Sequence, residues 1–225
     1  MTTHATPSPD TLSPDAWRRL IHTVFRPSDS EKTLAILVDL PDDLRGDDAD
    51  WRDRRELGAS WRRQLGEALR DDGFTVELWH YPNAGTNNGD LPERAWPWDG
   101  GARHHVDDLD AGAGVPFTEL FDRVPLFVAM SEFSATAPLK VASKRHGFRA
   151  ATMPGFSAAM MPALDLDLAE VDRRCKHLKA LLDVAAAADF TFTAHGAEST
   201  LRLDLRHRSA HASSGLLHDA GGAGV

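Results

Sequence analysis

The chain has 225 residues, of which 42% are hydrophobic, and a formal net charge of −9. This length allows one large domain or one domain with part of another, and the composition excludes wholesale disorder. The acidic balance lacks the clustered basic residues that a nucleic-acid backbone requires, so no nucleic-acid partner is expected.

The cysteine count and the hydropathy pattern indicate the cellular compartment of the protein. A single cysteine, Cys175, excludes a disulfide framework and fits a reducing compartment. No apolar run approaches the roughly 20 residues of a membrane helix. The N-terminal residues have neither the basic head nor the apolar core of a secretory signal. We therefore expect a cytoplasmic protein without a membrane partner, and a flexible leader over residues 1–13.

The first elements alternate between helix and strand. Ser13 and Pro14 are a typical helix start, and apolar residues at helical spacing predict a helix that ends before Pro27. Residues 33–40, TLAILVDL, predict a strand that is buried on both faces. A helix over 51–72 and a strand over 74–81 would complete a βαβ unit. The arginine residues of this helix are interleaved with acidic residues and predict a solvated face: Arg52, Arg54, Arg55, Arg62, Arg63 and Arg70.

The next stretch, residues 82–114, is rich in glycine, asparagine and proline and predicts a long functional or mobile loop. Further elements follow it: a short helix over 116–123, strands over 124–130 and 148–152, and between these strands a helix that stops at Gly147. Together these patterns predict an α/β fold with a mainly parallel sheet flanked by helices.

A change of pattern occurs in FRAATMPGFSAAM, residues 148–160. From Asp167 onward, apolar residues at helical spacing predict a long helix, with Cys175 as a small buried residue on its apolar stripe. Two runs in which apolar and polar residues alternate, one on each side of HGAEST, predict a β-hairpin with one apolar face. Residues 206–225 are polar and glycine-rich and suggest no terminal element. The expected domains are thus an α/β domain over 14–155 and an incomplete second domain over 156–225.

Residues 124–225 resemble the thermophilic metallo-aminopeptidase family, which includes aminopeptidase T, aminopeptidase S and proteins named leucyl aminopeptidase. GFRAATMPGF is similar to the Gly-x-Arg-x-x-x-x-Pro-Gly-Phe pattern of the family, and a long helix follows it. The family usually has Gly-Thr-Asp-Leu where this chain has Gly196, Ala197, Glu198 and Ser199. SSGLLHDAGGAGV is similar to the segment that precedes an Asn-Leu-Pro-x-Gly-Glu motif in the family.

The resemblance implies an N-terminal α/β domain and a C-terminal domain with two divalent metal ions per subunit. The complete protein would hydrolyse N-terminal residues from peptides, and it is a possible homodimer. The first ligand of the family is the Glu of Asn-Leu-Pro-x-Gly-Glu, which would lie beyond Val225. No catalytic or metal-binding residue therefore transfers to this sequence, its substrate-binding residues are unknown, and no cofactor is expected in this chain.

Several side chains resemble site residues without forming a complete motif. His104, His105, Asp107 and Asp108 have the chemistry of metal ligands, but adjacent residues of an extended chain point in opposite directions. Four histidines of the hairpin and tail lack the spacing of a helical ligand pair: His195, His207, His211 and His218. Neither Ser131 nor Ser157 lies in a Gly-x-Ser-x-Gly nucleophile elbow. A structural or solvated role is the preferred interpretation for all of these residues.

Two alternatives to an incomplete peptidase remain. The first is a non-catalytic α/β binding or interaction module, in which the apolar face of the hairpin should be covered. The second is a relative of the branch of the same fold that opens a dihydroxypyridine ring with one iron. A truncated protein, by contrast, should leave the apolar hairpin face bare and prone to association.

Overall fold

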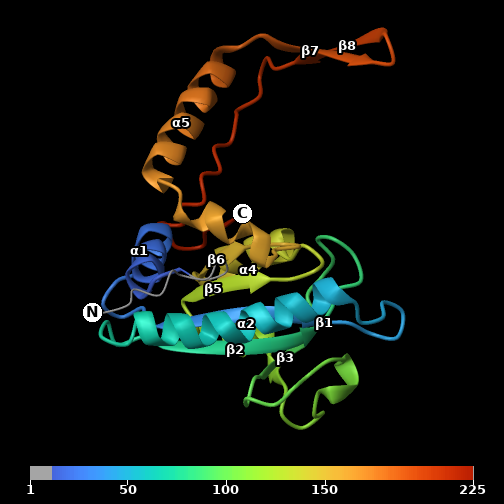
Figure 1. Ribbon diagram of the computed structural model, residues 1–225. Coiled ribbons are helices and arrows are strands. Elements are labelled where there is room, and N and C mark those ends of the chain that lie inside the picture. Colours follow the sequence, from blue (N-terminus) through green and yellow to red (C-terminus); the bar gives the residue numbers. More distant parts are fainter. Residues whose placement is uncertain (1–11, 225) are drawn as a thin grey trace, which may run out of the picture. The chain divides into compact units, whose positions relative to one another are not determined.

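The computed structural model describes residues 12–224 (Figure 1). Most of the leader expected over 1–13 lies outside the described residues. The described residues form two compact units: unit 1 comprises residues 12–166 and 215–224, and unit 2 comprises Asp167–Ser214.

Unit 1 is built on a seven-stranded sheet with the order β4-β3-β2-β1-β5-β6-β9. The strands β2, β1, β5, β6 and β9 are parallel to one another, whereas β3 and β4 form an antiparallel edge beside β2. The α/β fold with a mainly parallel sheet is therefore confirmed. The strand bounds are β1 Thr33–Leu40, β2 Thr75–Pro82, β3 Arg94–Pro97, β4 Val115–Pro116, β5 Leu126–Met130, β6 Arg149–Thr152 and β9 Ala223–Gly224.

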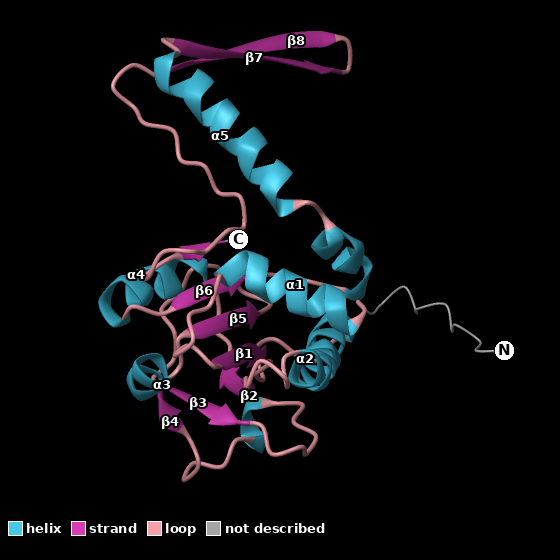
Figure 2. Ribbon diagram, turned by 90° about the vertical axis from the view of Figure 1, so that its left-hand side faces the viewer, coloured by secondary structure: helices cyan, strands magenta, loops and turns pink. Residues whose placement is uncertain are grey.

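Helices cover both faces of this sheet (Figure 2). The helices α1 (Pro14–Phe25) and α2 (Ala49–Ala68) pack on one face, and α3 (Phe117–Arg123) and α4 (Thr136–His146) pack on the other. Strand β1 lies between the two layers, and its last seven residues are buried. This double burial explains why the run contains aliphatic residues without polar alternation.

Close packing of α2 on β1 depends on Gly58. A Cβ atom at this position would lie 2.8 Å from Cγ2 of Val38. The glycine therefore lets the helix approach the central strand more closely than any other residue type would.

Three short strands were not expected from the sequence, and one of them, β4, includes Pro116, where the expected helix over 116–123 was to begin. Strand β3 lies inside the stretch 82–114 that was expected to be a loop, and β9 lies in the tail that was expected to hold no terminal element. The second expectation is wrong because Ala223 and Gly224 pair in parallel with Ala150 and Ala151. Strands of two to four residues are too short to carry a detectable hydrophobic period.

The turn after β6 redirects the chain within unit 1. Gly155 adopts a positive φ of 63°, and its N–H donates to the carbonyl of Ser131 at 2.8 Å. The 3-10 helix η2 (Ala158–Asp165) follows and buries Met161 in the core beside α1. The unit boundary thus lies after Leu166, eleven residues later than the expected boundary at 155.

Unit 2 contains the helix α5 (Leu168–Val184) and an antiparallel hairpin of β7 (Ala187–Ala194) and β8 (Ala197–Asp204). The hairpin turn is His195–Gly196, and both residues have positive φ, as a two-residue turn of type I′ requires. The long helix and the hairpin were both expected. Helix α5 has no buried residue, so the prediction that Cys175 is buried is wrong; its side chain is partly exposed, and Sγ lies 3.7 Å from the carbonyl of Ser213.

Candidate functional site

The carboxyl ends of β1 and β5 form the point at which the strand order of unit 1 reverses. Chain segments leave β1 and β5 in opposite directions there, which makes this edge the usual ligand-binding place of open α/β sheets. Near these ends lie Asp39, the penultimate residue of β1, and the segment 131–133, which follows β5.

Asp39 is buried at this edge, with 1% of its surface exposed. Its carboxylate accepts hydrogen bonds from the backbone N–H groups of Glu132 at 2.9 Å and Phe133 at 3.3 Å. Burial raises the pKa of Asp39 to about 7, although the two N–H groups and the nearby Arg54 act in the opposite direction. The residue therefore fixes the loop after β5 and ionises near neutral pH.

Arg54 and Arg55 of α2 also lie near this edge, and both are buried. Arg54 forms an ion pair with Glu132, and its guanidinium lies over the ring of Trp51. Arg55 donates two parallel hydrogen bonds of 2.9 Å to Asp47. The expectation that the arginines of this helix form a solvated face is thus wrong at these two positions, because loop carboxylates pair with them.

The metal-like residues predicted from the sequence are capping groups of the 3-10 helix η1 (Val106–Asp108). The Asp108 carboxylate accepts the N–H groups of His104 at 2.6 Å and His105 at 3.0 Å, and these bonds lower its pKa. The Nδ1 atom of His105 accepts the N–H of Asp107 at 3.2 Å.

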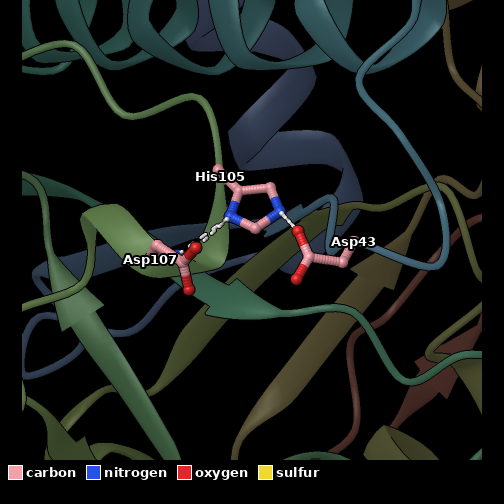
Figure 3. Close-up of side chains that lie close together, drawn as sticks. All are labelled: Asp43, His105 and Asp107. Atoms are coloured by element: carbon pink, nitrogen blue, oxygen red, sulfur yellow. Dashed lines mark hydrogen bonds and ion pairs between the residues drawn. The ribbon is translucent and has the colours of Figure 1, made fainter.

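Asp43, His105 and Asp107 offer ligand atoms that lie within 4.8 Å of one another. Figure 3 shows, however, that the two carboxylates flank opposite nitrogens of the His105 ring. The distances are 3.5 Å from Nε2 to Asp43 and 3.2 Å from Nδ1 to Asp107. A single ion cannot use both ring nitrogens, and both carboxylates are largely exposed. The arrangement fits a surface cluster of polar side chains around η1 better than a metal centre.

A cavity of about 290 Å³ lies beside α2 and β2 in unit 1. Its polar lining includes Arg52, Arg55, His80 and Arg103, and Leu78 and Trp98 contribute apolar walls. His80 is buried, and neither of its ring nitrogens has a hydrogen-bond partner within the described part of the chain. Burial, followed by the charges of Arg103 and Arg55, lowers the pKa of His80 to about 3.

The other candidate residues do not converge on a site in the described residues. His195 occupies the hairpin turn, His207 has a positive φ, His211 is exposed, and Nε2 of His218 lies 2.9 Å from the carbonyl of Thr23. Ser131 is buried at the end of β5. Ser157 precedes η2 without a side-chain capping bond.

The apolar side chains of unit 2 are exposed. On the hairpin, Phe190, Phe192, Leu201 and Leu203 are each 42–54% exposed, and Phe190 pairs with Leu201 across the strands. On α5, Leu178, Leu181 and Leu182 are also exposed. Phe190 and Phe192 lie side by side, with ring centroids 6.4 Å apart, and exposed apolar groups that gather in this way mark an interaction site or an uncovered core.

Sequence reasoning did not single out Asp39 or His80 as site residues. Asp39 had a signal, because it is the only charged residue in the run 33–40. A charge inside an otherwise apolar buried strand must be compensated. The signal for His80 was weaker. His80 lies at two-residue spacing from Phe74, Val76 and Leu78, which places it on the same inward face of the strand.

No protein-family model, curated protein or solved structure matches this chain. Within residues 12–224, no helix combines the length and the apolar character that crossing a bilayer would need.

Proposed function

We propose that the chain is the N-terminal part of a metal-dependent, aminopeptidase-like protein. The complete protein would remove N-terminal residues from peptides in the cytoplasm, as a possible homodimer without nucleic-acid or membrane partners. The proposal rests on the resemblance of residues 124–225, and the single observation that supports it best is the exposed apolar surface of unit 2. A helix and a hairpin that expose apolar faces are expected where further chain completes the domain.

The order of elements also supports this proposal. An α/β unit precedes the Met153-Pro154-Gly155 turn, and a separate helix–hairpin unit follows it. The resemblance implies this order. It also implies that the metal ligands follow Val225, and the Asp43–His105–Asp107 group does not fit a two-metal centre. We therefore assign no catalytic step to the residues of this chain.

The chemistry of the complete protein would come from the two ions. When bound, they supply a hydroxide nucleophile and polarise the scissile carbonyl. The contribution of this chain would be architectural: unit 1 forms the scaffold, and the turn at Gly155 with η2 leads the chain toward the second unit.

The test compares two proteins. The gene is read beyond codon 225 in all three frames for Asn-Leu-Pro-x-Gly-Glu, and the chain extended through that motif is produced beside the 225-residue chain. With Zn²⁺ or Co²⁺, the extended protein should hydrolyse leucine p-nitroanilide, and the 225-residue chain should not. The matched control is the extended protein with the motif Glu replaced by Gln, which should be inactive but folded.

Two results contradict the proposal. One is metal-dependent hydrolysis by the 225-residue chain itself, which would place the ligands inside it. The other is the absence of the motif from every frame.

A second candidate function, a non-catalytic binding module, is favoured by the cavity at His80 in unit 1. In a self-sufficient module, the apolar surface of unit 2 would be covered by a partner. The 225-residue chain would then be functional by itself, and it would sediment as a single species of one size.

A further inference from the structure

We propose that the cavity beside α2 and β2 binds a small organic monocarboxylate, held by the imidazole of His80 and the guanidinium groups of Arg52 and Arg103. This inference concerns unit 1 and does not depend on the metal centre proposed above. Three independent features of the cavity carry it: an unpartnered buried imidazole, an excess of cationic side chains, and apolar walls.

The imidazole is the most specific feature. His80 is 3% exposed and lines the cavity, and both of its ring nitrogens lack hydrogen-bond partners in the described structure. A neutral imidazole offers one N–H donor and one acceptor. Buried polar groups in proteins are almost always hydrogen-bonded, so an oxygen that accepts from this ring is the complement it lacks.

The arginine side chains add positive charge that is only partly matched. Arg55 is matched by its bidentate pair with Asp47. Arg103 is 11% exposed, but its carboxylate partner Asp99 lies 3.5 Å away and is 72% exposed. Among residues 12–224, Arg52 forms no ion pair. Water screens an exposed carboxylate, so the carboxylate neutralises the positive charge of a buried guanidinium only in part. The remaining positive potential favours one negative charge in the cavity.

The remaining walls limit the ligand to a monoanion with an apolar body. Glu56 lines the rim and would repel a second negative charge. Leu78, Ala59 and Trp98 would contact the carbon atoms of the ligand. The Trp98 ring is held in place because its Nε1 donates to the carbonyl of Gly101 at 2.7 Å and the Arg62 guanidinium lies over it.

The loop that forms one wall is fixed by its own turn. Gly100 has a φ of 100°, a conformation that favours glycine, and the N–H of Gly101 donates to Asp99 at 3.0 Å. Arg103 donates to the carbonyl of Pro97 at 2.8 Å, which holds its guanidinium near His80. The cationic group is therefore positioned before a ligand arrives.

The experiment is a titration of the ¹⁵N-labelled 225-residue chain with benzoate, followed through the histidine ring resonances. His80 is assigned from the His80→Leu variant. We expect a saturable shift of the His80 resonances with a dissociation constant in the millimolar range. Benzamide, which has the same shape without the charge, should bind at least tenfold more weakly, and so should inorganic phosphate.

Variants separate binding from folding. Arg103→Met should weaken benzoate binding at least tenfold while the thermal unfolding midpoint shows that the protein is folded. Arg63→Met is the control, since Arg63 is an exposed arginine of α2 that does not line the cavity. It should leave the affinity unchanged. If His80→Leu does not fold, Arg103→Met still decides the question.

Three outcomes overturn the proposal. They are the absence of a saturable shift up to 50 mM benzoate, equal binding of benzamide or phosphate, and unchanged affinity in a folded Arg103→Met variant.

Discussion

Ionisation of Asp39 should lower the free energy of unfolding as the pH rises, and replacing Asp39 with asparagine should remove this contribution. Burial raises the pKa of Asp39 from 3.8 to about 7, so the folded protein binds this proton more tightly than the unfolded chain does. The stability from this group is therefore fully present below pH 4 and is lost as the pH rises from about 4 to about 7. Such a change in pKa corresponds to about 4 kcal/mol in the free energy of unfolding.

The assay is urea denaturation of wild type and Asp39→Asn at pH 4, 5, 6, 7 and 8. Other carboxylates with lowered pKa values, such as Asp72 and Glu77, change stability in the opposite direction, so the difference between the two proteins is the informative quantity. The free energy of unfolding of wild type minus that of the variant should fall by about 4 kcal/mol between pH 4 and pH 8.

A surface variant provides the control for this experiment. Asp43→Asn removes a carboxylate whose side chain is 94% exposed, and it should change the free energy of unfolding by less than about 0.5 kcal/mol at each pH. A difference between wild type and Asp39→Asn that stays constant across this pH range would refute the account of a buried carboxyl group at the end of β1.

Three further substitutions test other parts of the structure. Gly58→Ala should lower the free energy of unfolding by about 1–3 kcal/mol in urea denaturation because the new Cβ would lie 2.8 Å from a Val38 methyl group; Gly66→Ala on the same helix meets no atom within 4 Å and should raise it by up to about 1 kcal/mol. Equal effects at the two sites would contradict the close approach of α2 to β1. Arg149→Met should cost about 3–5 kcal/mol by the same measurement, since the buried guanidinium pairs with Glu31 and donates to the carbonyl of Phe25; a cost below about 1 kcal/mol would mean that these contacts are not formed. Phe192→Ser should reduce self-association in sedimentation velocity, because the side chain lies on the exposed apolar face of the hairpin, and an unchanged profile would show that this face does not drive association.

The sequence was sufficient to predict the elements whose packing imposes a strong pattern. The strand β1 could be predicted because it is buried on both faces, which selects an unbroken aliphatic run. Helix α1 could be predicted because Ser13 caps it and Pro14 follows the cap. These signals are local, so no knowledge of the partner strands or helices was needed.

The short edge strands and the unit boundary depend on distant partners. Strand β9 exists through its pairing with Ala150 and Ala151, which lie more than 70 residues earlier in the chain. The residues Ala158–Asp165 belong to unit 1 because Met161 packs near α1, a contact that no local periodicity reveals.

The candidate site illustrates the same limit. His105 lies between Asp43 and Asp107 because the segment before α3 returns to the end of β1, where the N–H of Val106 donates to the carbonyl of Pro41 at 3.1 Å. Likewise, Arg54 is buried because Glu132 reaches it from the end of β5. Charge pairs between segments far apart in the sequence cannot be identified from the spacing of charges along one helix.

The metal content of the two protein forms tests the central proposal most directly. After incubation with Zn²⁺ and removal of free metal, elemental analysis should find two ions per chain in the protein extended through the Asn-Leu-Pro-x-Gly-Glu motif. The 225-residue chain should hold less than about 0.1 ion, as expected when the ligands lie beyond it. Two ions in the 225-residue chain, or no stoichiometric metal in the extended protein, would contradict the proposal that this chain is the scaffold of a metallo-aminopeptidase.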